Sequence, residues 1–350
     1  MKLDYFENAL KKKYEQKHCQ QLQCALSKPE DFINFTSHDS LGLSTHPYVQ
    51  EKTIEAIMRW GSGSTLSRPL CDHLCAHADL EARFCSFLKA EQTLLFPCAF
   101  KAQKALFKTL SKTGATFFIE RSYPLQAIRR HIQSTIHQFD HNNPSPLPDG
   151  REPKIILAPS VCPKTGTILD IHALQIHAAK SDALLIIDDS YALGVLGPQG
   201  MGLATMRSDI TIGSFGKTTG SFGAYIATFS LLREFIDQSA PMAPLPPATL
   251  GALDAALDLI PDMDAERRSI LTQAAAIRRR LSLSHSVVES RSHIVAIKDA
   301  HTLSDKLADQ GIIAMPTDLP SLTLNIGTAH TPAVIKALYA AIDAEPACVR

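Results

Sequence analysis

The chain has 350 residues, and its 35 lysine and arginine residues balance 35 aspartate and glutamate residues, which gives a formal net charge of zero. This balance argues against a nucleic-acid or polyanion binder, and no apolar run approaches the roughly 20 residues that a bilayer span needs. The length allows a large buried core in two domains or in one large domain.

The amino-terminal stretch and the cysteines indicate a cytoplasmic protein. "MKLDYFENALKKKYEQKH" is charged and lacks the apolar core of a signal peptide. Cys71 and Cys75 alternate with His73 and His77, but within one helical pattern these spacings cannot all face one ion. We therefore expect reduced thiols and no metal site.

Helical and strand-like patterns alternate along the chain, which favours a mostly parallel sheet covered by helices. We expect a helix over residues 2–26, then a short strand and a loop with Gly, Ser and Pro over 32–47. An amphipathic helix that ends at Gly61 and a helix over 71–89 should follow. Short apolar runs then follow, as expected of strands buried on both faces: "QTLLFP", "ATFFIE", "KIILAPS", "ALLIIDD", "DITIGSF" and "AYIATFS".

The last third of the chain has a second, smaller αβ pattern behind a proline-rich break. Two helical segments, "APLPPATLGALDAALDLI" and "DAERRSILTQAAAIRRRLSL", precede the strand-like runs "HIVAIKDA" and "SLTLNIG". Four prolines between residues 235 and 250 suggest a boundary there. We expect an amino-terminal helix and arm over 1–45, a large domain over 46–235 and a small domain over 236–350.

Two charged residues follow neighbouring strand-like runs. Asp188 and Asp189 end one run, and Lys217 follows the next run 29 residues after Asp188. Ligands of open α/β sheets bind at the carboxyl ends of strands. A lysine that forms a Schiff base and an acid that keeps a pyridine nitrogen protonated are what pyridoxal phosphate requires there. The alternative is a simple Asp–Lys salt bridge at a strand end.

A strand, a turn at Pro97-Cys98-Ala99-Phe100 and a helix form a third element in "TLLFPCAFKAQKALFKTL". The free backbone N–H groups at such a helix start form a seat for phosphate. The alternative is an ordinary βα turn, because the segment has no glycine-rich loop.

In order and spacing, "FINFTSHDSLGLSTHP", "IIDDSYALGVLGPQGMG", "GSFGKTTGSFGAYI" and "GTAHT" resemble the α-oxoamine synthases, which are fold-type I pyridoxal-phosphate enzymes. The resemblance covers roughly residues 30 to 345, and its most specific part is the pair "DDxxxxGVLGxxGxG" and "SFGKxxGxxGAY". It implies an α/β transferase with a mostly parallel seven-stranded-type sheet in the large domain, a smaller carboxy-terminal αβ domain, and a homodimer with shared active sites.

The resemblance also implies roles for individual residues. Lys217 becomes the Schiff-base lysine, and Asp188 becomes the partner of the pyridine nitrogen. The turn of Cys98, Ala99 and Phe100 binds the cofactor phosphate, with help from the Ser214 hydroxyl. Further residues expected around the cofactor are Ser160, Tyr123 and Tyr191.

Several positions differ from the family pattern. Tyr191 replaces a histidine near the cofactor's phenolic oxygen, and Tyr123 replaces a histidine that stacks on the cofactor ring. A tyrosine can stack and can donate a hydrogen bond, but it shuttles protons less well than a histidine. His38 replaces an asparagine that grips the amino acid. Other substrate positions hold Pro163, Thr165, Ser321 and Thr323, the last two in place of arginines. Because a bidentate arginine is the ordinary carboxylate clamp, Arg68 is a candidate replacement. Neutral drift within a working site is the alternative.

The resemblance favours an acyltransferase that joins an amino acid to an acyl thioester, carried by coenzyme A or by a carrier protein, and releases an aminoketone. The biotin-pathway enzyme 8-amino-7-oxononanoate synthase is the first candidate. A second hypothesis is another pyridoxal-phosphate reaction, such as transamination or simple decarboxylation. A third is a non-catalytic family member that acts as a scaffold or regulatory partner. No nucleic acid or membrane is expected as a partner.

Overall fold

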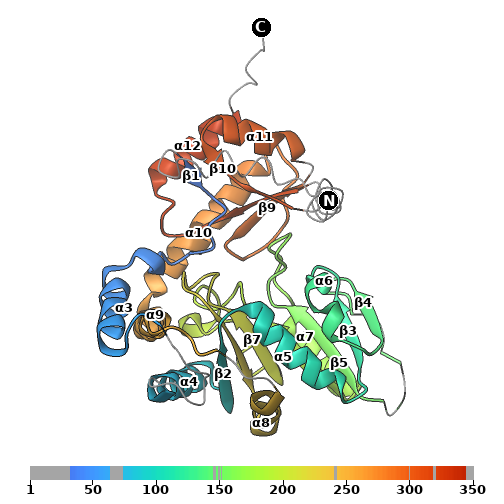
Figure 1. The fold of residues 1–350 in the computed structure, drawn as a ribbon. Helices are drawn as coiled ribbons and strands as arrows, with labels where there is room; N and C mark the ends of the chain where they lie inside the picture. Colours follow the sequence, from blue (N-terminus) through green and yellow to red (C-terminus); the bar gives the residue numbers. More distant parts are fainter. Residues whose placement is uncertain are drawn as a thin grey trace, which may run out of the picture.

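The structure is a computed structural model that describes residues 32–63, 74–144, 147–148, 150, 152–239, 243–298, 300–317 and 321–343. The helix expected over residues 2–26 and the candidate Arg68 lie outside these residues. Figure 1 shows a larger part built around a central sheet and a smaller part above it, which contains the carboxy-terminal helices and strands.

The large sheet has seven strands in the order β2-β8-β7-β6-β5-β3-β4, and it confirms the expected mostly parallel α/β architecture. Its strands β3, β4, β5, β6 and β7 run parallel, whereas β8 is antiparallel to both β7 and β2. The bounds are β2 Gln92–Phe96, β3 Thr116–Glu120, β4 Ile136–Phe139, β5 Lys154–Pro159, β6 Ala183–Asp188, β7 Ile210–Ser214 and β8 Ala224–Thr228.

Successive residues of the central strands point to opposite faces of the sheet, and both faces are covered. On β5, Ile155 and Leu157 pack in the core that contains residues of α5 (Ala99–Ser111) and α8 (Ser230–Ser239). Ile156 and Ala158 face α7 (Ile171–Lys180) in another core. The mostly apolar sequences of β5 ("KIILAP") and β6 ("ALLIID") are those expected of strands buried on both sides.

Three helices cover the β2–β8 end of the sheet. They are α3 (Pro47–Trp60), α4 (Leu74–Leu88) and α9 (Pro247–Leu259), which Figure 1 shows together at one side of the molecule. Helix α3 starts with a proline in its first turn and ends at Gly61, as the sequence predicts. Arg83 of α4 forms ion pairs with Asp254 and, at 2.6 Å, with Asp258 of α9.

The smaller part contains an antiparallel sheet in the order β11-β12-β9, packed against helices of the carboxy-terminal third. Its elements are α10 Asp264–Leu281, β9 Ile294–Lys298, α11 His301–Asp309, β11 Met315–Pro316, β12 Ser321–Asn325 and α12 Pro332–Asp343. The short strands β1 (Ile33–Asn34) and β10 (Ile312–Ile313) pair in parallel, so the segment before α3 joins the carboxy-terminal part. The domain limits at residues 45 and 235 stay predictions.

Short helices complete the chain: α6 (Leu125–Ile128) and the 3-10 helices η2 Leu43–Thr45, η4 Arg129–His131, η5 Pro198–Gly200 and η6 Ile260–Asp262. Within the described ranges, no helix is both long and apolar enough to cross a bilayer. The same ranges contain no group of three or more His, Cys, Asp or Glu residues arranged to hold a metal ion. Of the Cys71, His73, Cys75 and His77 group, Cys75 and His77 are described. Cys75 is exposed, whereas His77 is buried and its Nε2 accepts a hydrogen bond from the Leu245 N–H at 2.7 Å.

Candidate active site

Asp188 and Lys217 lie at one edge of the large sheet. Asp188 is the last residue of β6, and it pairs with Ile212 of the parallel neighbour β7. Lys217 follows β7 by three residues, in the turn that leads to β8. Burial raises the pKa of the Asp188 carboxyl, and the positive charge of Lys217 opposes this increase, so the two side chains are close enough to interact. The expected arrangement of a carboxylate and an amine at adjacent strand ends is therefore present.

The turn that carries Lys217 is held by buried hydroxyl groups. Thr219 donates to the carbonyl of Phe215 at 2.7 Å, and Thr218 donates to the carbonyl of Leu193. Gly220 has φ +57°, and a Cβ there would lie 2.4 Å from Oδ1 of Asp39. Gly220 thus makes room for Asp39, and the backbone on both sides of the Lys217 amine is fixed.

Asp188 is half-buried and has several polar neighbours. Its Oδ1 accepts a hydrogen bond from the Ser190 N–H at 3.0 Å, and the Tyr123 hydroxyl interacts with the same carboxylate. Gln103 of α5 donates its Nε2 to the Tyr123 oxygen at 2.7 Å. Burial raises the pKa of Asp188, and the hydrogen bonds from Ser190 and Tyr123 oppose this increase.

Asp189, next in the chain, has a different environment. Its side chain is fully buried, and Oδ2 accepts from the N–H groups of Leu203 at 2.8 Å and Ala204 at 3.1 Å. Burial raises the pKa of Asp189 to about 6, although the hydroxyl of the buried Ser160 acts in the opposite direction. Asp189 therefore anchors the backbone of residues 203 and 204. Ser160, which directly follows β5, lies beside the Asp189 carboxyl.

Tyr191 and His38 lie beside the lysine. The Nζ of Lys217 is 4.8 Å from the centroid of the Tyr191 ring, and the His38 ring meets that ring edge-on at 5.3 Å between centroids. A cation over an aromatic face is attracted by the ring quadrupole. Burial, followed by the Lys217 charge, lowers the pKa of His38 to about 4, so this imidazole is neutral at pH 7.

Two more basic residues lie behind His38. His293 is buried, and burial together with the charges of His38 and Arg278 lowers its pKa to about 3. The buried Arg278 guanidinium donates to the carbonyls of Ser292 and, at 2.8 Å, Ile294, which ties α10 to β9. Its pKa falls to about 10 through burial, so it stays charged at pH 7. Neither residue was singled out from the sequence.

The predicted phosphate seat lies at the same edge of the sheet. Cys98 is the residue before α5, and no side chain caps the N–H groups of the helix. Ala224 of β8 pairs with Phe96 on one side and with Ser214 on the other, which places the ends of β2 and β7 two strand spacings, or roughly 10 Å, apart. The free N–H groups of Ala99 and Phe100 and the Ser214 hydroxyl therefore face one region of the edge.

The positions that lack the family's arginines contain no cation. Thr323 donates its hydroxyl to the Met315 carbonyl at 3.3 Å, and the Ser321 and Thr317 hydroxyls are 2.5 Å apart. Thr165, which stands at an acidic position of the family pattern, makes a similar contact with Thr167 at 2.7 Å. These short hydroxyl groups are used within their own strands and turns, so they do not replace a carboxylate clamp.

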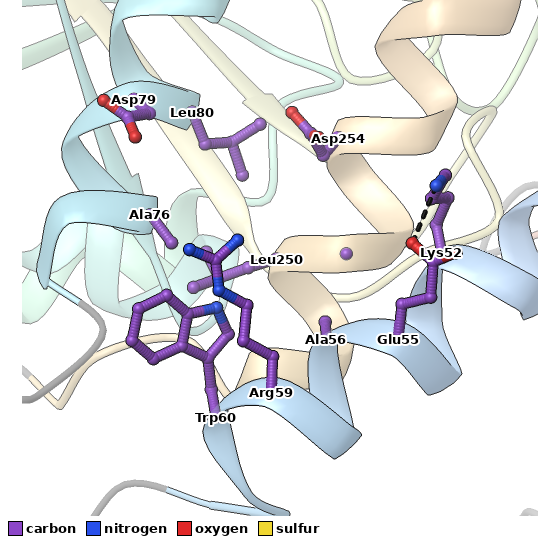
Figure 2. A pocket seen from close by; sticks show the side chains of 11 residues that line it. Lys52, Glu55, Ala56, Arg59, Trp60, Ala76, Asp79, Leu80, Leu250 and Asp254 are labelled. Carbon is purple, nitrogen blue, oxygen red and sulfur yellow. Dashed lines mark hydrogen bonds and ion pairs between the residues drawn. The ribbon is translucent and has the colours of Figure 1, made fainter.

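A surface hollow lies elsewhere on the large domain and contains none of the predicted site residues. Figure 2 shows it between α3, α4 and α9. Its cavity volume is about 260 Å³. At its rim the Arg59 guanidinium lies over the Trp60 ring at 4.7 Å, and Lys52 pairs with Glu55 at 2.7 Å. At its floor, a Cβ on Gly251 would lie 2.5 Å from the Lys52 carbonyl. We interpret the hollow as the margin of this close helix packing.

Comparisons with known proteins match this chain over most of its length. The family model for aminotransferase class I and II matches residues 30–342. The chain belongs to this family. A Desulfosudis oleivorans protein, provisionally named 8-amino-7-oxononanoate synthase, is 33% identical over an alignment of 340 positions that covers 89% of this chain and 88% of that protein. The resemblance to α-oxoamine synthases is thereby confirmed.

Two solved structures of related enzymes share the fold of this family member. A serine palmitoyltransferase variant from S. paucimobilis, with bound PLP–myriocin, has a TM-score of 0.81 at 21% identity and covers 89% of this chain and 86% of its own. An 8-amino-7-oxononanoate synthase from Francisella tularensis has a TM-score of 0.77 at 22% identity and covers 89% of this chain and 97% of its own. At these identities the likeness establishes the fold, which is that of the fold-type I transferases.

The structure brings most of the predicted residues together and adds others. Asp188, Lys217, Tyr191, Tyr123 and His38 form one connected group, and the α5 turn lies on the same edge. Residues that the sequence analysis missed are Gln103, Ser190, His293 and Arg278. Of these, only Ser190 had a sequence signal, since it lies within the aspartate motif. The roles of all these residues stay predictions, as does that of Arg68.

The donor set fits pyridoxal phosphate. The aldehyde of this cofactor needs an amine, its pyridine nitrogen needs a carboxylate, and its phosphate needs N–H donors. Lys217, Asp188 and the N–H groups at the start of α5 offer these groups at a single edge of the sheet. The Nδ1 atom of His38 is buried without a hydrogen-bond partner among the described residues, so this edge also holds an unsatisfied polar atom.

Proposed function

We propose that the protein is a pyridoxal-phosphate-dependent acyltransferase that condenses an amino acid with an acyl thioester, loses carbon dioxide and forms an aminoketone. The observation that carries this proposal is the placement of Lys217 and Asp188 at the ends of neighbouring parallel strands. The names of the related enzymes make 8-amino-7-oxononanoate formation, in biotin biosynthesis, the first candidate. The PLP adduct in the related serine palmitoyltransferase supports the choice of cofactor.

In this proposal the chain's own residues bind, orient and move protons. The Lys217 Nζ would hold the cofactor and, when free of it, would accept the α-proton of the amino acid. Asp188 would pair with the pyridine nitrogen, and the hydrogen bonds from Ser190 and Tyr123 favour its charged form against the effect of burial. When bound, pyridoxal phosphate supplies an electron sink that stores the charge left by the proton.

The substrate is positioned beside the lysine. Tyr191 keeps the Lys217 Nζ over its ring face, which limits where the proton is delivered. His38 is neutral at pH 7, so it orients the amino acid through a hydrogen bond and not through charge. Positive charge for the substrate carboxylate would come from Arg68, as the sequence analysis proposes.

A second candidate is a family member with another pyridoxal-phosphate reaction or with no catalysis. The observation in its favour is the loss of the clamp: Ser321 and Thr323 are not arginines, and their hydroxyls hydrogen-bond to Thr317 and to the Met315 carbonyl in their own sheet region. Such a protein would bind the cofactor and convert an amino acid to an oxoacid without releasing thiol, or would bind without turnover.

One set of measurements separates these candidates. The protein is loaded with pyridoxal phosphate, and its visible spectrum is recorded with L-alanine, glycine or L-serine. Acyl thioesters are then added, and free thiol is measured. A spectral shift with one amino acid followed by thiol release supports the acyltransferase. Oxoacid formation without thiol release supports the other reaction, and a spectrum that no amino acid shifts supports the non-catalytic member.

A homodimer with shared active sites is part of the proposal, and it rests on the resemblance. Light scattering on a sizing column tests it, and a mass of one chain would contradict it. A cytoplasmic location stays a prediction from the sequence.

A further inference from the structure

Charge is unevenly distributed in this neutral chain. Between residues 97 and 139 the only acidic residue is Glu120, which is buried at the end of β3. The basic residues of the same segment are Lys101, Lys104, Lys108, Lys112, Arg121, Arg129 and Arg130. The chain's zero net charge therefore conceals one strongly basic segment.

Four of these residues form what we call the lysine stripe: Lys101, Lys104, Lys108 and Lys112. All four are exposed on α5 or at its carboxyl end. At 100° per residue their side chains fall within an arc of about 80°, and they span roughly 16 Å along the helix axis. The opposite face of α5 is buried against the large sheet, through Ala102, Leu106 and Leu110 among others.

Arginines of the neighbouring helix η4 extend the stripe sideways. The Arg130 guanidinium lies 5.9 Å from the centroid of the Phe100 ring, which is 41% exposed. The His131 ring meets the same phenylalanine edge-on at 5.6 Å. Burial lowers the pKa of His131, as do the charges of Lys104, Arg130 and Lys108, so these cations lie close to one another.

The lysine stripe lowers the stability of the isolated chain. Among the described residues, no carboxylate pairs with any of the four lysines, whereas Arg121 nearby pairs with Asp140 at 2.7 Å. Like charges at i,i+4, as in Lys104–Lys108 and Lys108–Lys112, cost a few tenths of a kcal/mol each. Surfaces without a binding role normally mix the two signs. A uniform row of this kind indicates an acidic partner.

The stripe begins beside the candidate active site. Strand β2 is parallel to β7, because both are antiparallel to β8, so α5 starts at the edge that holds Asp188 and Lys217. Lys101 lies in the first turn of α5, directly after the predicted phosphate seat. A partner bound along α5 would thus have one end at the entrance to the reacting groups.

We infer that the lysine stripe docks the acidic surface of a protein that carries the acyl thioester, so that its thioester arm enters beside the α5 turn. This inference rests on the proposed function. A protein fits better than a nucleotide carrier, because the stripe is a convex helix face and lines no described pocket. A row of about 16 Å also exceeds what the phosphates of one coenzyme A would cover, whereas it suits an acidic helix.

The test compares two donors of the same acyl group, one on a bacterial acyl carrier protein and one on coenzyme A. The variants are Lys104→Glu/Lys108→Glu and the milder Lys104→Gln/Lys108→Gln. The matched control is Lys180→Glu/Lys336→Glu, which reverses two exposed lysines on other helices. The binding of unacylated carrier protein is measured separately by calorimetry at about 50 and 200 mM salt, so this arm does not require turnover.

We expect the glutamate variant to raise the carrier-protein KM and Kd by at least about tenfold, with the glutamine variant between it and the wild type. The coenzyme A KM should change less than about twofold, and the wild-type Kd should weaken with salt. Equal effects of stripe and control variants, or no wild-type carrier binding, would overturn the inference. A parallel rise in the coenzyme A KM would assign the stripe to nucleotide phosphates. Lack of turnover with both donors would instead count against the proposed function.

Discussion

Gln103 donates its side-chain amide to the Tyr123 hydroxyl over 2.7 Å, and the same tyrosine interacts with the Asp188 carboxylate. Because the tyrosine oxygen accepts from Gln103, its own proton is free to be donated to Asp188. This connection links a residue in the middle of α5 to the carboxylate that we propose as the partner of the cofactor nitrogen. It also gives Tyr123 a role that the sequence alone did not suggest, next to the expected one of stacking.

Tyr123→Phe and Gln103→Leu should both raise the pKa of Asp188, because the hydrogen bond from Tyr123 lowers it. The affinity for pyridoxal phosphate should then fall more steeply than in the wild type as the pH is lowered, by roughly three- to tenfold for Tyr123→Phe and less for Gln103→Leu. Absorbance titrations of cofactor binding across pH measure this. Gln138→Leu, at an exposed position on β4, is the control, and identical pH curves for all four proteins would refute the connection.

The two neighbouring aspartates should respond differently to mutation. The folded-state pKa of Asp189 is raised to about 6, so its contribution to stability is greatest below its unfolded pKa near 4 and is lost as the pH rises through 6. Asp189→Asn removes this titration. The unfolding free energy of the variant minus that of the wild type should therefore increase as the pH rises from 4 to 6, by on the order of 3 kcal/mol. Denaturant unfolding at several pH values measures the difference.

Asp189→Ala should instead destabilise the fold by about 2–4 kcal/mol at pH 7, because the N–H groups of Leu203 and Ala204 lose their acceptor. Asp188→Asn should leave stability nearly unchanged and reduce cofactor binding. Loss of stability in Asp188→Asn, with none in Asp189→Ala, would reverse the assignment of the two residues.

The fold was largely predictable because its central strands are continuous apolar runs buried on both faces. The strand β4 was missed, since "IHQF" exposes His137 and Gln138 at the edge of the sheet and therefore lacks such a run. Asp188 and Lys217 were predictable because one ends a strand and the other closely follows the next strand. The Gln103–Tyr123 contact was not, because it depends on how α5 packs beside β3. The anchoring role of Asp189 likewise depends on a loop that returns 14 residues later.

His38 should act as a neutral hydrogen-bonding group. With its pKa lowered to about 4 by burial and by Lys217, it should not titrate between pH 5.5 and 8. His38→Asn, which restores the family's residue, should bind the amino acid within about threefold of wild type, whereas His38→Leu should weaken binding roughly tenfold. Spectral titration with the amino acid measures both. A wild-type transition near pH 6.5 that disappears in His38→Asn would contradict this account.

Gly220→Ala should disrupt the turn that carries Lys217. The new Cβ would meet Asp39, whose carboxylate accepts from the N–H groups of Leu43 and Ser44 at 3.0 Å. Together with a φ of +57°, this should cost roughly 2–4 kcal/mol of stability and lower cofactor affinity. Gly114→Ala is the matched control, because Gly114 has φ +75° and nothing within 4 Å of its Cβ position; about 1 kcal/mol is expected there. Equal losses in the two variants would remove the Asp39 contact from the explanation.

The central claim is that Lys217 holds pyridoxal phosphate at the edge shared with Asp188. The most direct measurement is borohydride reduction of the cofactor-loaded protein, followed by peptide mass analysis, with Lys217→Ala and Lys180→Ala beside the wild type. The account predicts a visible absorbance band and a cofactor mass on the Lys217 peptide in the wild type and in Lys180→Ala, and neither in Lys217→Ala. An unlabelled Lys217 peptide, or an equal label on Lys217→Ala, would contradict it.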